Sequence, residues 1–106
     1  MDSIILEYIN KRMNIRGYED FQLASYSFKS NGVKAEYRIP AYNEFYFLVS
    51  KSISSGTIIH SDTNAYKADD NYALQNYQIQ EFSGMIIIEN PERTTQVYEF
   101  LRAIPK

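Results

Sequence analysis

Residues 21–39 read FQLASYSFKSNGVKAEYRI, two runs of alternating apolar and polar residues that meet at Asn31-Gly32. A two-residue hairpin turn needs positive φ at both central positions, and Asn-Gly adopts this geometry more readily than other dipeptides. With that turn, one side of the hairpin carries the facing pairs Phe28 and Ala35, Tyr26 and Tyr37, and Ala24 and Ile39. The other side pairs serines with charged residues. Turn chemistry and hydrophobic pattern agree on this register, which predicts an antiparallel hairpin.

Two positions interrupt the alternation. Phe21 and Leu23 have the parity of the polar face. This indicates either a bulge or strand start near Leu23, or a sheet that is covered on both faces at that end. Pro40 cannot donate a hydrogen bond to a neighbouring strand, so we expect the second strand to end at Ile39 and residues 40–43 to form a turn.

Helical spacing of apolar residues marks both ends of the chain. Residues 3–14 predict an N-terminal helix. Residues 91–103 predict a C-terminal helix, with Asn90 as the N-cap and Pro91 at the first helical position. The spaced apolar residues are Ile4, Ile5, Tyr8, Ile9 and Met13 in the first helix, and Val97, Phe100, Leu101 and Ile104 in the second.

The middle of the chain predicts further strands. Residues 44–50 are apolar without alternation, which is typical of a central strand covered on both faces. Residues 57–61 are rich in β-branched side chains and predict a short strand. Residues 62–76 are polar and rich in Asn and Asp, and we interpret them as a long loop, with or without a helical turn around residues 66–74.

A last pair of strand-like runs follows this loop. Residues 77–82 alternate, with Tyr77, Ile79 and Glu81 on one face, and residues 85–89 form an apolar run. Ser83-Gly84 separates the two runs. It forms either a break between two strands or a bulge within one longer strand.

The order of these elements predicts the fold class. A helix, about six strands and a second helix indicate one α+β domain that spans residues 1–106. We expect a mostly antiparallel sheet, sandwich-like or barrel-like, with the N-terminal and C-terminal helices packed on it.

The composition excludes several function classes. The chain contains no cysteine, which removes disulfides, thiolate catalysis and Cys-ligated zinc. The longest apolar runs, residues 45–49 and 85–88, are too short to span a bilayer. The start of the chain, Met-Asp-Ser, lacks the basic segment of a signal peptide. We therefore expect a soluble protein that is made in a cytoplasm and has no membrane partner.

Charge argues against a nucleic-acid partner. The net charge is −2, and basic and acidic residues are interspersed without a basic patch. Lys11, Arg12 and Arg16 form a small basic cluster. Glu19 and Asp20 follow it directly, so we interpret the cluster as a solvated charged surface.

Catalytic and metal-binding patterns are absent from the sequence. His60 is the single histidine, and its neighbours Ser61 and Asp62 alternate in direction along a strand, which does not build a Ser-His-Asp triad. Counted from Asp62, the EF-hand positions that need Gly and Glu hold Lys67 and Ala73. A nonstandard calcium site in this loop stays open beside a loop of Asx-turns that needs no metal. We expect no enzyme activity, catalytic residue, cofactor or metal.

Aromatic residues supply the main functional signal. The chain has ten tyrosines and six phenylalanines, more than one small core needs, and surface tyrosines surrounded by Ser and Asn are typical of contact sites. Structureless segments as long as residues 62–76 are uncommon in compact domains and are usually either functional or disordered. The predicted protein-contact residues are Asp62, Asn64, Tyr66, Tyr72 and Tyr77.

In composition, this cysteine-free chain rich in Tyr, Asn and Ser resembles small virion proteins of tailed bacteriophages, such as accessory capsid, decoration, connector and tail proteins. The resemblance covers the whole chain, rests on no motif and transfers no residue. It implies a structural protein in a homo-oligomeric or hetero-oligomeric assembly, in the cytoplasm or in a virion. Two alternatives stay open: a small cytoplasmic inhibitor or adaptor with one protein partner, and a Tyr-rich β domain that binds a carbohydrate or small ligand.

Overall fold

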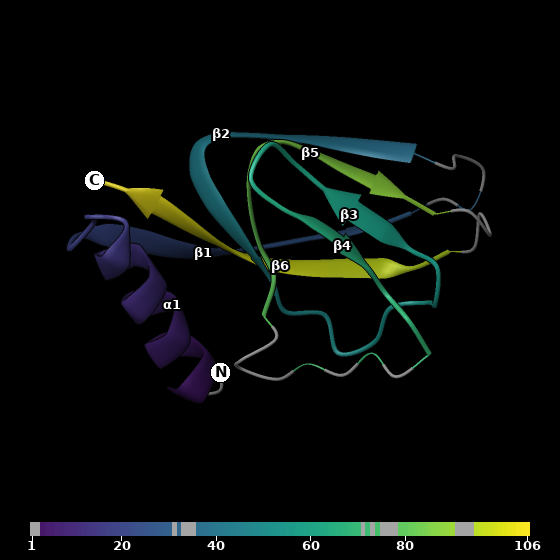
Figure 1. The fold of residues 1–106 in the computed structure, drawn as a ribbon, viewed down its shortest axis with the longest axis horizontal. Helices are drawn as coiled ribbons and strands as arrows, with labels where there is room; N and C mark the ends of the chain where they lie inside the picture. The colour runs from purple at the N-terminus through teal and green to yellow at the C-terminus, as the bar shows by residue number, and fades with distance from the viewer. Residues whose placement is uncertain are drawn as a thin grey trace.

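The computed structural model describes residues 3–30, 32, 36–70, 72, 74, 79–90 and 95–106 of the chain. Within these residues one helix and six strands are present (Figure 1). They are α1 (Ser3–Ile15), β1 (Phe21–Lys29), β2 (Glu36–Leu48), β3 (Ile58–His60), β4 (Ala65–Lys67), β5 (Glu81–Glu89) and β6 (Val97–Pro105). The strands form one antiparallel sheet in the order β1-β6-β2-β5-β3-β4, which confirms the predicted α+β class and the mostly antiparallel sheet.

The N-terminal helix is confirmed, one residue longer than predicted. Ile5, Ile9 and Met13 recur every four residues on one face of α1, and all three are buried. The helix ends in a Schellman motif, in which Gly17 has φ of 93° and the Tyr18 N–H donates to the Met13 carbonyl at 2.9 Å. In the part of the chain that the structure describes, no helix is long and apolar enough to cross a membrane.

A bend in β2 organises the sheet. Residues 36–41 pair with β5 alone, whereas residues 45–48 pair with β6, and two of these, Tyr46 and Phe47, also pair with β5. The register against β5 shifts between Ala41 and Tyr46, and Asn43 in the bend has φ of 64°, a left-handed value that Asn tolerates better than most residues. The bend allows one strand to belong to two parts of the sheet, so that the sheet curves around an interior.

Two predictions about strand ends have different outcomes. The predicted end at Ile39 and turn at residues 40–43 are wrong, because β2 continues through Pro40. In the described part of the chain, β5 is the one strand that pairs with β2 at this point, and a proline fits a strand that is hydrogen-bonded on one side. Across from it, β5 runs without a break through Gly84, whose φ is 86°, which confirms one longer strand at Ser83-Gly84.

The curved sheet has a hydrophobic core on each face. The curvature encloses one core, and α1 packs against the opposite face (Figure 1). The inner core consists of Ile39, Ala41, Tyr46, Leu48, Ile53, Ile59, Ala68, Phe82, Ile86, Ile88, Tyr98 and Phe100. The helix-side core consists of Ile5, Ile9, Met13, Phe47, Ile79, Leu101 and Ala103.

Strands near the helix are covered on both faces, as predicted for residues 44–50. Side chains of residues 45–48 alternate between the helix-side core and the inner core. Phe21 and Leu23 of β1 also pack against the helix-side core. The register between β1 and β6 is unbroken over all nine residues, so no bulge is present there. Of the two interpretations of Phe21 and Leu23, coverage on both faces is therefore correct.

The predicted hairpin pairing is wrong. β1 pairs along its length with β6, so Tyr26 lies opposite Phe100 and not opposite Tyr37, which belongs to the part of β2 that pairs with β5. Gly32 has φ of 76°, as the predicted turn requires, and Asn31 lies outside the described residues.

The apolar face of the predicted hairpin nevertheless exists. The rings of Phe28 and Tyr37 contact each other with their centres 5.6 Å apart, because both side chains pack against the inner core from different strands. Ala24 lies opposite Arg102 instead of Ile39, and Ala35 lies outside the described residues. The side-chain directions were predicted correctly and the partner strand was not.

The predicted C-terminal helix is also wrong, because residues from Val97 onward form the strand β6, which lies between β1 and β2. Tyr98 and Phe100 belong to the inner core, and Leu101 and Ala103 belong to the helix-side core. A strand that is apolar on both faces produces spacings that imitate a helix. The start of the predicted helix, residues 91–94, lies outside the described residues.

Candidate functional site

The strand β1 lies at one end of the sheet, with β6 on one side. Among the described residues, no strand pairs with its other side. None of its nine residues is fully buried, although Phe21, Leu23, Tyr26 and Phe28 pack partly against the two cores. The edge of β1 therefore combines backbone groups that can accept another strand with apolar side chains that are only half covered.

This edge lacks the features that usually protect an edge strand. Natural edge strands avoid pairing with other chains because they are short or because they contain charged residues, proline or a bulge. β1 has nine residues in unbroken register, no proline, and Lys29 at its end as its one charge. The opposite edge of the sheet is β4, which has three residues and is protected by its shortness. Of the two edges, β1 is the better template for another strand.

A cleft opens between β1 and the first part of β2. Its volume is about 450 Å³, and its walls are Tyr26, Phe28, Glu36, Tyr37, Arg38 and Ile39. The Phe28 ring stacks on Tyr98 beneath it, with the ring centres 5.1 Å apart. At the rim, the Arg38 Nε donates to the Glu36 carboxylate at 2.9 Å. The cleft thus presents aromatic walls and a charge-balanced rim.

A second cleft of about 480 Å³ lies beside Gln96, but its polar groups already stabilise the fold. The Gln96 side-chain amide donates to the hydroxyl groups of Thr57 and Tyr98 at 3.1 and 3.0 Å. Its carbonyl oxygen accepts from the Ser54 N–H at 2.8 Å. With these groups engaged, the second cleft is a weaker candidate than the cleft beside β1.

The segment predicted as a long loop, residues 62–76, contains the strand β4, so the interpretation as structureless is wrong. The structure brings Tyr66 and Tyr72 together as an edge-to-face pair with ring centres 6.2 Å apart. The Tyr72 hydroxyl donates to the Ser50 carbonyl at 2.7 Å, and burial raises the pKa of this hydroxyl to about 12. Both rings pack partly against the inner core. These contacts hold the segment to the fold, and a role in partner contact stays a prediction.

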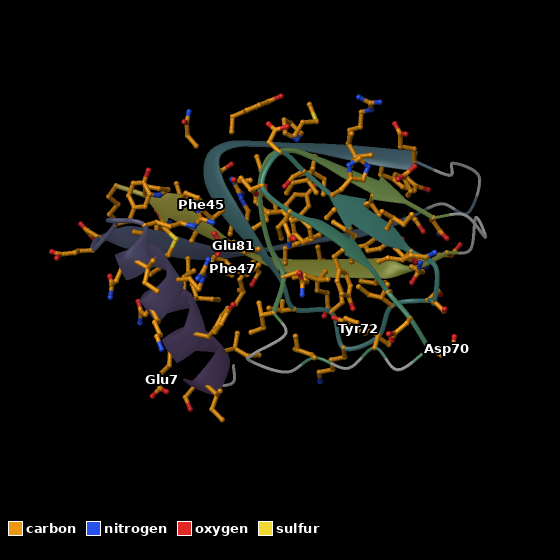
Figure 2. The ribbon with its side chains drawn as sticks, viewed as in Figure 1. Glu7, Phe45, Phe47, Asp70, Tyr72 and Glu81 are labelled. Atoms are coloured by element: carbon orange, nitrogen blue, oxygen red, sulfur yellow. The ribbon has the colours of Figure 1, made fainter. Side chains whose placement is uncertain are left out.

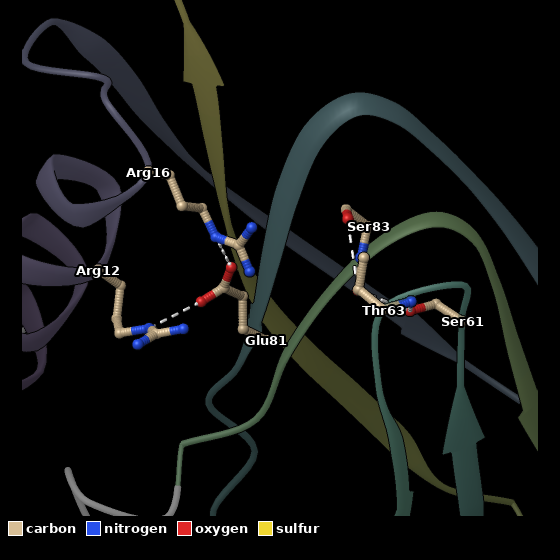
Figure 3. Close-up of polar contacts among 6 residues, drawn as sticks. All are labelled: Arg12, Arg16, Ser61, Thr63, Glu81 and Ser83. Carbon is tan, nitrogen blue, oxygen red and sulfur yellow. Dashed lines mark hydrogen bonds and ion pairs between the residues drawn. The ribbon is translucent and has the colours of Figure 1, made fainter.

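The other predicted contact residues lie apart from this pair. The Asn64 side chain donates to Gln80 at 3.0 Å. The carboxylate of Asp62 lies against Gly84, where an added Cβ would be 2.7 Å from its Oδ2. Beside it, the Thr63 hydroxyl contacts Ser61 and Ser83, which ties the β3–β4 turn to β5 (Figure 3). Tyr77 lies outside the described residues.

A buried ion cluster joins α1 to the sheet, and sequence reasoning missed it. The Glu81 side chain is 7% exposed and forms ion pairs with Arg12 and Arg16 (Figure 3). The Arg12 pair measures 3.2 Å. In Figure 2, Glu81 lies with Phe45 and Phe47 between helix and sheet. A signal was present in the sequence: Glu81 shares a strand face with Ile79, and a carboxylate on an apolar face needs a cation.

The remaining candidate of the sequence, His60, forms an ordinary cross-strand pair. Its Nε2 lies 3.3 Å from the Glu89 carboxylate on β5, and both side chains are partly exposed. Within the part of the chain that the structure describes, no three His, Cys, Asp or Glu residues group in a way that could hold a metal ion.

Comparison with protein-family models, with curated proteins and with solved structures finds no match for this chain.

Proposed function

We propose that this protein is a non-enzymatic structural subunit that joins a protein assembly through the open edge of β1. The observation that carries the proposal is the nine-residue edge strand without proline, bulge or internal charge. Strand addition at such an edge is a common mode of protein recognition, because main-chain hydrogen bonds provide affinity and alternate side chains provide specificity.

The half-buried side chains support the same interpretation. Phe21 and Leu23 on one face of β1, and Tyr26 and Phe28 on the other, pack only partly against the two cores. A strand added beside β1 would cover more of all four. Burial of this apolar surface would stabilise the complex beyond its backbone hydrogen bonds.

The composition favours a virion as the assembly. Small virion proteins of tailed bacteriophages resemble this chain in their lack of cysteine and their richness in Tyr, Asn and Ser. In this proposal the chain is made in the cytoplasm and is then incorporated as an accessory capsid, connector or tail subunit. Its partners are proteins and not nucleic acid or membrane.

The native mass of the protein in extracts of its source tests the proposal. A structural subunit elutes in a large complex, at a fixed ratio to the other proteins in it. Elution as a free 12.4 kDa chain under all conditions would overturn the proposal. A small complex with one unrelated protein would instead identify an inhibitor or adaptor.

A second candidate function is binding of a carbohydrate or other small ligand in the cleft between β1 and β2. Its volume of about 450 Å³ lies in the range of small-molecule sites, and aromatic walls suit the apolar faces of sugar rings. A thermal-shift screen with a glycan panel tests this function, because a ligand that binds the folded state raises the Tm. The replacement Tyr37→Ala should abolish such a shift, and an unchanged Tm across the panel argues against it.

A further inference from the structure

We propose that the edge of β1 pairs with β1 of a second copy of this chain, antiparallel, about a two-fold axis at Ser25. This inference rests on the proposed function and specifies the partner of that edge. An antiparallel strand that pairs with its own copy generates a closed two-fold dimer, in which the same surface is used twice. With the axis at Ser25, each residue of β1 faces the residue of the second copy whose number brings the sum of the two numbers to 50, so that Ser25 faces Ser25.

This register gives compatible side-chain neighbours on both faces. On the inner-core face, Tyr26 lies beside Ala24 of the second copy, and Phe28 lies beside Gln22. Each ring meets a small or flexible neighbour, so the half-buried aromatic residues gain cover without a clash between rings. On the other face, Ser25 meets Ser25 of the second copy, and facing hydroxyl groups can hydrogen-bond across two strands.

Charge complementarity supports the same occupant. Lys29 is the one charged residue in β1, and Glu19 and Asp20 directly precede its first residue. In the proposed register Lys29 lies opposite Phe21 of the second copy, so it comes next to the acidic pair. The two-fold axis repeats this contact at the other end of the interface. Within the described residues, neither Lys29 nor Glu19 forms an ion pair in the single chain, whereas Asp20 lies 3.8 Å from the Lys106 Nζ.

The other surfaces of the sheet do not compete for this role. β4, the opposite edge, offers three residues, and α1 covers the sheet face beside Phe21 and Leu23. The dimer would extend the six-stranded sheet through two β1 strands into a continuous sheet of both copies. Each α1 helix would then lie on the same face of the extended sheet.

A charge exchange at the axis tests the register. Ser25 is exposed, and its replacement by Lys or Glu places two like charges directly opposite each other in the dimer, which is destabilising. We expect the wild type at twice the chain mass by light scattering, Ser25→Lys and Ser25→Glu each at the monomer mass, and their equimolar mixture at the dimer mass again. Ser27→Lys, which faces Leu23 of the second copy, is the matched control and should stay dimeric. Circular dichroism confirms that each variant is folded.

A disulfide at the same position gives an independent test, because the chain has no cysteine of its own. Facing residues in an antiparallel pair have Cα atoms about 4.5–5.5 Å apart, within the range of a disulfide. Ser25→Cys should therefore oxidise to a covalent dimer, and Ser27→Cys should not, because two copies of residue 27 are four positions out of register. Equal crosslinking of both variants, or of neither, would overturn the inference.

The outcomes separate this inference from the proposed function. A purified wild type that stays monomeric up to millimolar concentration, but elutes in a large complex from its source, overturns self-pairing and leaves the assembly role intact. A wild-type dimer that Ser25→Lys does not dissociate also overturns self-pairing through β1. A chain that is monomeric both when purified and in its source overturns both proposals.

Discussion

The inner core and the helix-side core share the strands β2 and β6 but are closed in different ways. The curvature of the sheet closes the inner core, whose largest buried side chains include Tyr98, Phe82 and Phe100. The helix α1 closes the helix-side core with Ile9 and Met13, and the Glu81 ion cluster joins the two elements. The comparison shows that the sheet folds around itself through long-range pairing, whereas the second core depends on the docking of one element.

Removal of a ring from the inner core should have the largest effect on stability. Phe82 is 0% exposed and comes from β5, opposite the bend of β2. We expect Phe82→Ala to lower the free energy of unfolding by about 4 kcal/mol, from lost burial and the cavity left behind. Urea denaturation measures this loss. A loss under about 1 kcal/mol would mean that the curved sheet collapses around the cavity and that the inner core is not rigid.

The equivalent change in the helix-side core should cost less and act locally. Ile9→Ala removes a fully buried side chain of α1, and we expect a loss of about 3 kcal/mol. Because this core is closed by one docked element, hydrogen exchange should accelerate first in α1, while β5 and β6 stay protected. Equal acceleration in helix and sheet would show that the two cores unfold as one unit.

High pH should weaken the inner core through Tyr98. Burial is the main cause that raises the pKa of its hydroxyl to about 12. The folded-state pKa lies above the unfolded value of about 10. The stability linked to the protonated Tyr98 hydroxyl is therefore fully present below pH 10. This contribution is lost as the pH rises from 10 to 12, and amounts to about 2–3 kcal/mol. Urea denaturation of the wild type and Tyr98→Phe across this pH range measures it, and the phenylalanine variant should show the smaller decline. Parallel declines would place the alkaline sensitivity elsewhere.

Whether an element is covered on one side or on two determined how well it could be predicted from the sequence. α1 contacts the sheet with one face, so its apolar residues show a clean helical period. β6 contacts both cores, so apolar residues occur at both parities, and Phe100 with Leu101 imitate a helix. The spacing of apolar residues therefore identifies a helix or strand that is covered on one side. It does not distinguish a helix from a strand when the element is covered on two sides.

The partner of a strand was harder to predict than its faces. Tyr26 and Tyr37 were correctly assigned to one apolar face, because that assignment depends on local alternation alone. Their strands are separated in the sheet because β6, which begins at Val97 although β2 already ends at Leu48, lies between β1 and β2. The open edge of β1 could not be predicted for the same reason, since it depends on which strands pair with β1, and in the described residues β6 alone does so.

The smallest predicted effect on stability is the loss of a charge, and it should differ between the ion cluster beside the helix-side core and an ion pair on the surface. The Glu81 carboxylate is held by two arginines in a nearly buried site, whereas the Glu36 carboxylate pairs with Arg38 in the open. Glu81→Gln keeps the side-chain shape but removes the charge. Arg12 and Arg16 are about one-third exposed and can turn toward water. We therefore expect the free energy of unfolding to fall by about 2 kcal/mol, less than the cost of leaving a charge buried without a partner.

The matched variant Glu36→Gln should change the free energy of unfolding by less than about 0.5 kcal/mol, because exposed ion pairs contribute little. Urea denaturation of both variants at low and high salt checks the difference. Equal losses would show that the ion cluster under α1 contributes no more than a surface pair and that apolar contacts alone hold the helix.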